Sequence, residues 1–438
     1  MSVRRTIGVV PDRTDAPDPR DVSEPPDPLD RIVGRIPREV RIVFAILFAA
    51  FAFYHHATAT LNRDEGPGRG DVSLADVRDA GIFPTRAWLD GVNPYDWDAF
   101  RAYDDRIGQP FPVYSPVHIV THLPFAVGPV EGSRVAFYWL SLWLVAGLSA
   151  LTLRAAGRRA TFESGAMLFG AILWSHPGAL SLVAGQSGPM LTIGAVLALT
   201  ASSPAMAVLG AVLVLTKPTF GLPVIAMMWA RGRGRSAIMG VAVTAAVSVV
   251  VFARLAASNS MQSIIDGFQN NLDVTAAIGS PKRIELFNSI ARLTGTSPPL
   301  VAELVFGVAV LATATLIVRR LWRSDPMSDL GLAIAWCTPT LVFFHGSWDL
   351  ITVIPAFVLL LRRDPGSVLT DPVRWTAVGL LAYALWNPWG RRFSEGLYND
   401  WFATLMAAGV RTASVTAAWA LLMVVAQFGT RRRAVGLR

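Results

Sequence analysis

Long apolar runs are the feature that most restricts what this chain can fold into. The run "RIVFAILFAAFAFYHHATA" (residues 41–59) and the run that ends in "LLMVVAQFG" (421–429) are long enough to cross a bilayer, which takes about 20 residues of helix. Of the 438 residues, 53% are hydrophobic and 16% are charged, whereas soluble domains average about 25% charged residues. The sequence therefore predicts an all-α polytopic membrane protein.

Further apolar segments recur along the chain and predict about twelve transmembrane or re-entrant helices. Several segments are shorter than a full span, and irregular backbone is tolerated at membrane depth only where it lines a cavity or is buried in protein. We therefore expect the short segments to form broken or re-entrant pairs around a cavity. The segments are residues 42–60, 135–153, 162–183, 188–202, 204–216, 219–230, 236–254, 299–318, 329–344, 348–361, 373–388 and 403–427.

Arginine clusters indicate how the segments are oriented. The clusters before the first segment, at "RGRGR" (231–235) and at "RRR" (431–433) fall at alternate ends of the segments. Because cytoplasmic loops are enriched in Lys and Arg, both termini are predicted to be cytoplasmic, in a plasma-membrane protein. The net charge of +8 then reflects these loops and not nucleic-acid binding.

The same orientation predicts the domain organisation. A transmembrane domain at 41–430 carries extracytoplasmic loops at 61–134 and 255–298. A disordered tail rich in Pro and acidic residues precedes it at 1–40, and a basic tail follows at 431–438.

Candidate chemistry lies at the extracytoplasmic end. The first loop carries many carboxylates, among them Asp76 and Asp79, and its apolar stretch 110–128 is predicted to lie at the membrane surface. Lys217 in "LVLTKPTFGLPV" belongs to a short link at the same end. A carboxylate there can act as a general base, and a lysine is a good phosphate ligand, although it could instead snorkel to the headgroups. The combination indicates transfer chemistry on a lipid phosphate.

Other motifs carry weaker signals. The triplet "DWD" (96–98) has the spacing of metal–nucleotide-sugar motifs but is common by chance, and the pair His118 and His122 lacks the context of a zinc site. The link "HGSWDL" (345–350) is either a helix cap with an interface aromatic or a contact for sugar or phosphate. The single cysteine, Cys337, is expected in the core. Neither a phosphate-binding loop nor a dinucleotide fingerprint is present, so no cofactor is predicted.

Several motifs together resemble a known family. In chain order they are "WLDGVNPYD" (88–96), "VYSPVHIVTHLPF" (113–125), "AGQSGPML" (184–191), the Lys-Pro element at 217–218 and "GSWD" (346–349). With their order and shared sidedness, the chain resembles the GT-C glycosyltransferases of family 87, the polyprenyl-phosphate-dependent mannosyl- and arabinofuranosyltransferases of actinobacterial type. The resemblance implies a GT-C-like helical bundle with a catalytic first loop.

The resemblance also implies a reaction and the residues that perform it. A sugar, mannose before arabinofuranose, would move with inversion from a polyprenyl-phosphate donor to a lipid-linked or cell-envelope glycan acceptor, without a metal ion. The family's catalytic Asp precedes Gly91 by about fourteen residues, next to Val77, so Asp76 is implied as the base and Asp79 as the neighbouring candidate. The donor phosphate would contact Lys217, Gln186, Arg391 and Arg392. Sugar or acceptor contacts would come from Tyr95, Tyr114, His118, His345 and Trp348.

Two alternatives remain from the residues themselves. A secondary transporter also contains paired short segments with Gly or Pro breaks, but it places ionisable residues inside the spans, where this chain has few. Another lipid-phosphate-dependent transferase would share the same carboxylates and cation.

Overall fold

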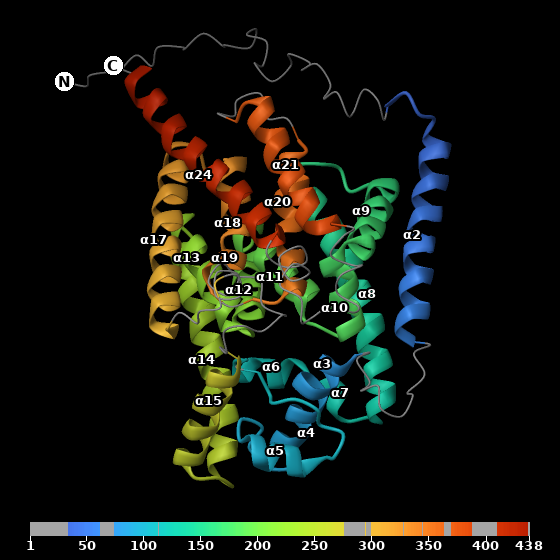
Figure 1. The fold of residues 1–438 in the computed structure, drawn as a ribbon, viewed down its shortest axis with the longest axis vertical. Coiled ribbons are helices and arrows are strands. Elements are labelled where there is room, and N and C mark those ends of the chain that lie inside the picture. The colour runs from blue at the N-terminus through green and yellow to red at the C-terminus, as the bar shows by residue number, and fades with distance from the viewer. Residues whose placement is uncertain are drawn as a thin grey trace, which may run out of the picture.

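The fold is helical throughout the part of the chain that the structure describes. The computed structural model describes residues 34–61, 74–112, 114–275, 294, 299–326, 328–343, 345–362, 369–387 and 410–436, and every regular element in these ranges is a helix (Figure 1). The all-α prediction is therefore confirmed.

Five helices are long and apolar enough to cross a membrane: α2 (Arg38–Leu61), α8 (Val130–Ala155), α14 (Gly234–Ala256), α17 (Leu300–Ser324) and α24 (Val410–Gly436). Helices α9 (Phe162–Trp174) and α10 (His176–Ala184) together form a sixth candidate span, bent by 74°. The other predicted segments also form helices, but shorter ones: α11 (Gly188–Thr200), α12 (Pro204–Leu215), α13 (Pro218–Ala230), α18 (Asp329–Cys337), α19 (Pro339–Val342), η2 (Ser347–Val353), α20 (Ile354–Leu360) and α21 (Asp371–Trp386). Length and composition thus identify five or six spans in the described residues, fewer than the twelve predicted segments.

Prolines explain why the apolar runs are divided into short helices. Pro177, Pro204 and Pro218 each lie in the first turn of a helix, where the missing N–H group costs nothing and the fixed φ suits a helix start. At the bend between α9 and α10, Ser175 has extended backbone, and its Oγ accepts a hydrogen bond from the Gly178 N–H at 3.1 Å. Helix α12 ends at Leu215 and α13 begins at Pro218, so Lys217 lies in a short link, as predicted.

Small residues let the central short helices approach closely. A Cβ at Gly210 of α12 would lie 2.4 Å from the backbone nitrogen of Ala198 and 2.6 Å from the carbonyl oxygen of Gly194, both on α11. Helices packed this closely gain van der Waals contact, which drives helix association in membranes. The short helices therefore form the core of the bundle, surrounded by the longer ones.

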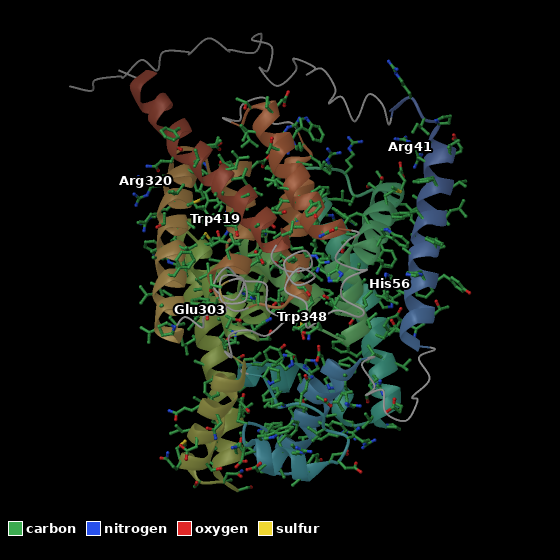
Figure 2. The ribbon with its side chains drawn as sticks, in the orientation of Figure 1. Arg41, His56, Glu303, Arg320, Trp348 and Trp419 are labelled. Atoms are coloured by element: carbon green, nitrogen blue, oxygen red, sulfur yellow. The ribbon has the colours of Figure 1, made fainter. Side chains whose placement is uncertain are left out.

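The two ends of the molecule differ in composition. Helix α2 begins and α24 ends at one end, where Arg41 and Arg320 also lie (Figures 1 and 2). The small helices of the first loop lie at the opposite end, together with α15 (Met261–Thr275) (Figure 1). This arrangement agrees with the predicted alternation of the arginine clusters, while the assignment of one end to the cytoplasm stays a prediction.

The first loop folds into a compact helical layer across that end. It contains α3 (Ala75–Val77), the π-helical turn η1 (Arg78–Ile82), α4 (Phe83–Leu89), α5 (Trp97–Tyr103), α6 (Pro116–Thr121) and α7 (Leu123–Ala126). Helix α14 holds this layer, because the Trp88 indole donates to the Val251 carbonyl at 3.1 Å and the Arg254 guanidinium donates to the carbonyls of Trp88 and Leu89. Helices α3, α6 and α7 lie between the rest of the layer and the bundle (Figure 1), which suits the surface position predicted for 110–128.

The structure places some domain boundaries differently. Helix α2 already begins at Arg38, α8 begins at Val130 inside the predicted first loop, and α24 continues to Gly436 through most of the predicted basic tail. The predicted disordered residues 1–33 and residues 276–293 and 295–298 of the second loop lie outside the described residues.

Candidate active site

Asp76 is the carboxylate that the structure brings to the junction between the loop layer and the bundle. Its Oδ1 accepts a hydrogen bond from the Gln109 side-chain amide at 2.7 Å, and its Oδ2 accepts one from the Gln186 amide. Gln109 belongs to the loop layer, whereas Gln186 belongs to the link between α10 and α11. The side chain is only half-buried. Two neutral donors therefore fix the carboxylate without neutralising its charge, and the side chain stays partly exposed.

The backbone of the α10–α11 link is shaped to receive α3. Gly185 has φ +73° and ends α10, and a Cβ at this position would lie 2.8 Å from Cγ1 of Val77. The Leu74 N–H donates to the Val183 carbonyl at 2.6 Å. Only glycine adopts this backbone conformation without strain and leaves room for Val77, so the link and α3 are in direct contact beside Asp76.

Asp79, the second predicted candidate, is held differently. Its side chain is 2% exposed, forms an ion pair with Arg78 at 2.7 Å and accepts a hydrogen bond from the Gly108 N–H at 3.1 Å. Burial raises the pKa of the Asp79 carboxyl, against the opposing effects of Arg78 and Gly108. These contacts connect η1 to the α5–α6 connection, so they favour a role for Asp79 in the structure of the loop.

Lys217 forms a buried ion pair with Asp349. The Lys217 Nζ lies 2.5 Å from Oδ2 of Asp349, with side-chain exposures of 12% and 2%. The same oxygen accepts a hydrogen bond from the Gly346 N–H at 3.0 Å and lies 3.2 Å from Nδ1 of His345. Lys217 is thus held by the first turn of η2, through Asp349. The alternative in which it snorkels to the headgroups is not what the structure shows.

Tyr114 is near both Asp76 and Asp349, since the charges of both carboxylates act on its phenol. The Ser115 N–H donates to the Thr216 carbonyl at 3.0 Å, which attaches this part of the loop to the link that carries Lys217. Burial, followed by the negative charges of Asp349 and Asp76, raises the pKa of the Tyr114 phenol above its usual value. The phenol is therefore protonated and able to donate a hydrogen bond to an anionic group bound between Asp76 and Asp349.

Two of the predicted sugar-contacting residues, Tyr95 and His118, are buried in the loop layer. Tyr95 is 0% exposed, and its hydroxyl donates to the Tyr114 carbonyl at 3.1 Å. The His118 ring is 3% exposed and lies between the rings of Tyr114 and His122, at centroid distances of 4.3 and 4.2 Å. Burial lowers the pKa of His118 well below its usual value. Both side chains support the loop layer and do not face an open site.

Of the remaining predicted residues, Trp348 and His345 lie next to Asp349, and the two arginines are not described. Trp348 is partly exposed in the first turn of η2, and its carbonyl accepts a hydrogen bond from the Ser181 Oγ at 3.4 Å. His345 is buried beside Asp349. Arg391 and Arg392 lie outside the described residues.

Gln109 was not among the sequence candidates, and Asp349 was considered only within the "HGSWDL" link, as a helix cap or a contact for sugar or phosphate. Asp349 belongs to the "HGSWDL" link, whose predicted position at the same end as Lys217 was the available signal. Gln109 carried no signal, because it stands alone among turn residues. Asp96 of the "DWD" triplet accepts a hydrogen bond from the Ala99 N–H and caps α5, so this carboxylate has a structural contact. Within the described residues there is no group of three or more His, Cys, Asp or Glu side chains that could hold a metal ion.

Comparison with known proteins identifies the family. The model of glycosyltransferase family 87 matches residues 112–344, just over half of the chain. The match includes Tyr114, Gln186 and Lys217, and it lies between Asp76 on one side and Asp349 on the other. No curated protein and no solved structure matches the chain. A helical membrane bundle with a carboxylate and an ion pair at one end suits a transferase, and it is the family match that decides against the transporter alternative: the chain belongs to glycosyltransferase family 87.

Proposed function

We propose that this membrane glycosyltransferase moves a sugar from a polyprenyl-phosphate donor to a lipid-linked or cell-envelope glycan on the extracytoplasmic face, with Asp76 as the general base. Mannose is the first candidate sugar and arabinofuranose the second. Family membership supports the sugar transfer. The polyprenyl phosphate, the sugar and the acceptor rest on the resemblance of the motifs.

The position of Asp76 is the observation that carries this proposal. A half-buried carboxylate, oriented by amides from the loop layer and from the bundle, lies where the two parts meet. A general base needs a fixed geometry and free access to one proton. The amides of Gln109 and Gln186 provide the fixed geometry, and the partial exposure of Asp76 is compatible with access by a hydroxyl. Gln186 is therefore better described as a positioning residue than as the phosphate ligand that the motif implied.

The reaction then follows from these positions. Asp76 accepts the proton of an acceptor hydroxyl while that oxygen forms a bond to the anomeric carbon of the sugar. The bond between the anomeric carbon and the phosphate oxygen breaks, and its electron pair leaves with the polyprenyl phosphate. Attack from the face opposite the phosphate inverts the anomeric configuration.

Lys217 and Tyr114 are placed to assist the leaving phosphate. The protonated Tyr114 phenol can donate a hydrogen bond to a phosphate oxygen, and the Lys217 ammonium has donors beyond the one directed at Asp349. In a site shielded from water, such fixed donors stabilise developing negative charge more than they would in water. Asp349 and His345 hold the ammonium in place, and Trp348 is the candidate surface for stacking of the sugar.

A comparison of two aspartate variants tests the proposal. In proteoliposomes supplied in parallel with polyprenyl-phosphate mannose and polyprenyl-phosphate arabinofuranose, Asp76→Asn should lower the rate of transfer about 10²–10⁴-fold, the usual effect of losing a positioned base. Donor binding should be retained, because Asn keeps the shape of the side chain. Asp79→Asn is the matched control and should retain most of the activity.

Two results would count against the proposal. If Asp79→Asn abolished transfer while Asp76→Asn left it intact, the base would be Asp79. If the wild-type protein used neither donor, the polyprenyl-phosphate class would be wrong, although membership of the family would stand.

A further inference from the structure

Arg411 is a buried cation that the proposed reaction does not use. It lies in the first turn of α24 and is 2% exposed. Its Nε and Nη2 atoms are buried and have no hydrogen-bond partner. A charged group in the apolar interior of a membrane protein is costly unless it is paired, and such groups mark functional sites.

The other buried arginines of the described residues provide an internal comparison. Arg134 is 6% exposed and pairs with Glu131 at 2.7 Å, and Arg374 is 4% exposed and pairs with Asp371 at 3.1 Å. The structure thus neutralises two buried guanidinium groups with a carboxylate one helical turn away. Arg411 has no carboxylate partner in the described part of the chain, so its charge is available to an external anion.

Arg411 lies toward the same end of the bundle as the candidate active site. Two turns further along α24, the Trp419 indole donates to Oγ1 of Thr338 at 3.1 Å, where α18 meets α19. Helix α24 begins in the middle of the bundle and ends at the end of the molecule where α2 begins, opposite the loop layer (Figure 1). Arg411 therefore lies about 12 Å from Trp419 along the helix axis, at 1.5 Å per residue, in the direction of the loop layer. Trp348 also lies on that side of Trp419 (Figure 2).

Neighbouring contacts connect Arg411 to the same link. The Tyr383 side chain of α21 lies close enough to Arg411 to interact with its charge, and α21 packs against η2, the helix that contains Asp349, the partner of Lys217. A guanidinium group offers donors in a planar fork that matches the oxygens of a phosphate. The candidate anion is therefore a phosphate that reaches this depth attached to a lipid.

We propose that Arg411 binds the phosphate of the polyprenyl-phosphate lipid, as a second cation in addition to Lys217. This inference rests on the proposed function, since it assigns a further ligand to the same donor. It explains why a buried arginine without a carboxylate partner in the described residues is retained in the first turn of a membrane-spanning helix.

Binding of undecaprenyl phosphate to the full-length protein in phosphatidylcholine nanodiscs tests this assignment. Arg411→Gln should raise the dissociation constant about 10–100-fold, as expected for loss of a charge-assisted contact, whereas Arg374→Gln should not change it. Undecaprenol, which lacks the phosphate, should not distinguish Arg411→Gln from the wild type. Without lipid phosphate, Arg411→Gln should unfold at the same temperature as the wild type or higher, because it removes a buried unpaired charge.

Three outcomes would overturn the assignment. One is unchanged binding of undecaprenyl phosphate by folded Arg411→Gln. Another is equal competition by phosphatidylglycerol, which would identify Arg411 as a site for an ordinary phospholipid headgroup. The third is a lower unfolding temperature of the lipid-free variant with an unchanged response to undecaprenyl phosphate, which would show a purely structural role.

A wild-type protein that does not bind undecaprenyl phosphate would refute the donor class as well, whereas loss of the Arg411 effect alone would leave the Asp76 mechanism intact.

Discussion

At the scale of single residues, the ion pair between Lys217 and Asp349 allows two roles of Lys217 to be tested. The lysine can stabilise the fold, and it can bind the donor. The pair is buried and short, so each charge is stabilised mainly by the other. Loss of either partner leaves an uncompensated buried charge, whereas replacement of both by apolar residues leaves no buried charge in the pair.

We expect Lys217→Met to lower the free energy of unfolding by about 3–5 kcal/mol, the usual cost of breaking a buried pair. The double variant Lys217→Met, Asp349→Leu should recover most of that stability. If Lys217 also contacts the donor, the double variant should still require a higher donor concentration for half-maximal transfer. Thermal unfolding and the donor dependence of transfer separate the two effects, and full recovery of both in the double variant would assign the pair a structural role alone.

Asp79 leads to a prediction about pH. Because burial raises its pKa in the folded protein, its contribution to stability is fully present below the unfolded value of 3.8 and is lost as the pH rises through the folded pKa. The wild type should therefore lose stability relative to Asp79→Asn as the pH increases above 3.8. The difference between the two unfolding temperatures, measured across a pH series, checks this. A difference that changes in the opposite direction would mean that the ion pair with Arg78 outweighs the effect of burial.

At the scale of helices and links, the site depends on where helices end. Asp76, Gln186, Lys217 and Asp349 all lie at helix termini or in the short links between helices. The positions of these links follow from local features, namely Gly185 at the end of α10 and Pro218 at the start of α13. Substitutions in a link should therefore affect catalysis more than equally strained substitutions elsewhere.

Gly185 and Gly232 form a matched pair for this comparison. Both have positive φ, +73° and +82°, but a Cβ at Gly185 would collide with Val77, whereas a Cβ at Gly232 would meet nothing within 4 Å. Alanine at either position should cost roughly 1–2 kcal/mol of backbone strain. Gly185→Ala should in addition displace α3 from the link and lower the rate of transfer, while Gly232→Ala should leave that rate unchanged. Equal rates in the two variants would show that contact between α3 and the link is not required.

Comparison of the predicted segments with the observed helices shows how much could be predicted from the sequence. Apolar runs and prolines are local signals, so the predicted segments correspond closely to the observed helices, and the links at 185–188, 216–218 and 345–349 were placed at one end. The hydrogen bond between Gln109 and Asp76 and the ion pair between Lys217 and Asp349 join residues 33 and 132 positions apart. Such pairs depend on how helices pack, which periodicity does not encode. For the same reason, the aromatic character of Tyr95 and His118 could not distinguish a sugar contact from a buried ring.

At the scale of the whole molecule, the two ends should be accessible from opposite sides of the membrane. Asp105 lies in the loop layer and Arg235 at the start of α14, and both side chains are exposed. The single native cysteine, Cys337, is 0% exposed and should give little background labelling. In intact cells, a membrane-impermeant thiol reagent should label Asp105→Cys and not Arg235→Cys. The reverse pattern would place the site on the cytoplasmic face.

The separation of Lys217 and Asp349 along the chain has a consequence for biosynthesis. At about 5–20 residues per second, the ribosome completes Asp349 roughly 7–26 s after Lys217, since 132 positions separate them. During that interval α12 and α13 are already made, but the counter-ion of Lys217 does not yet exist. We therefore expect the nascent helix pair to wait near the membrane surface, with its ammonium group among the headgroups, and to move inward only when η2 arrives. Snorkelling would then belong to the nascent chain, and the ion pair to the finished enzyme.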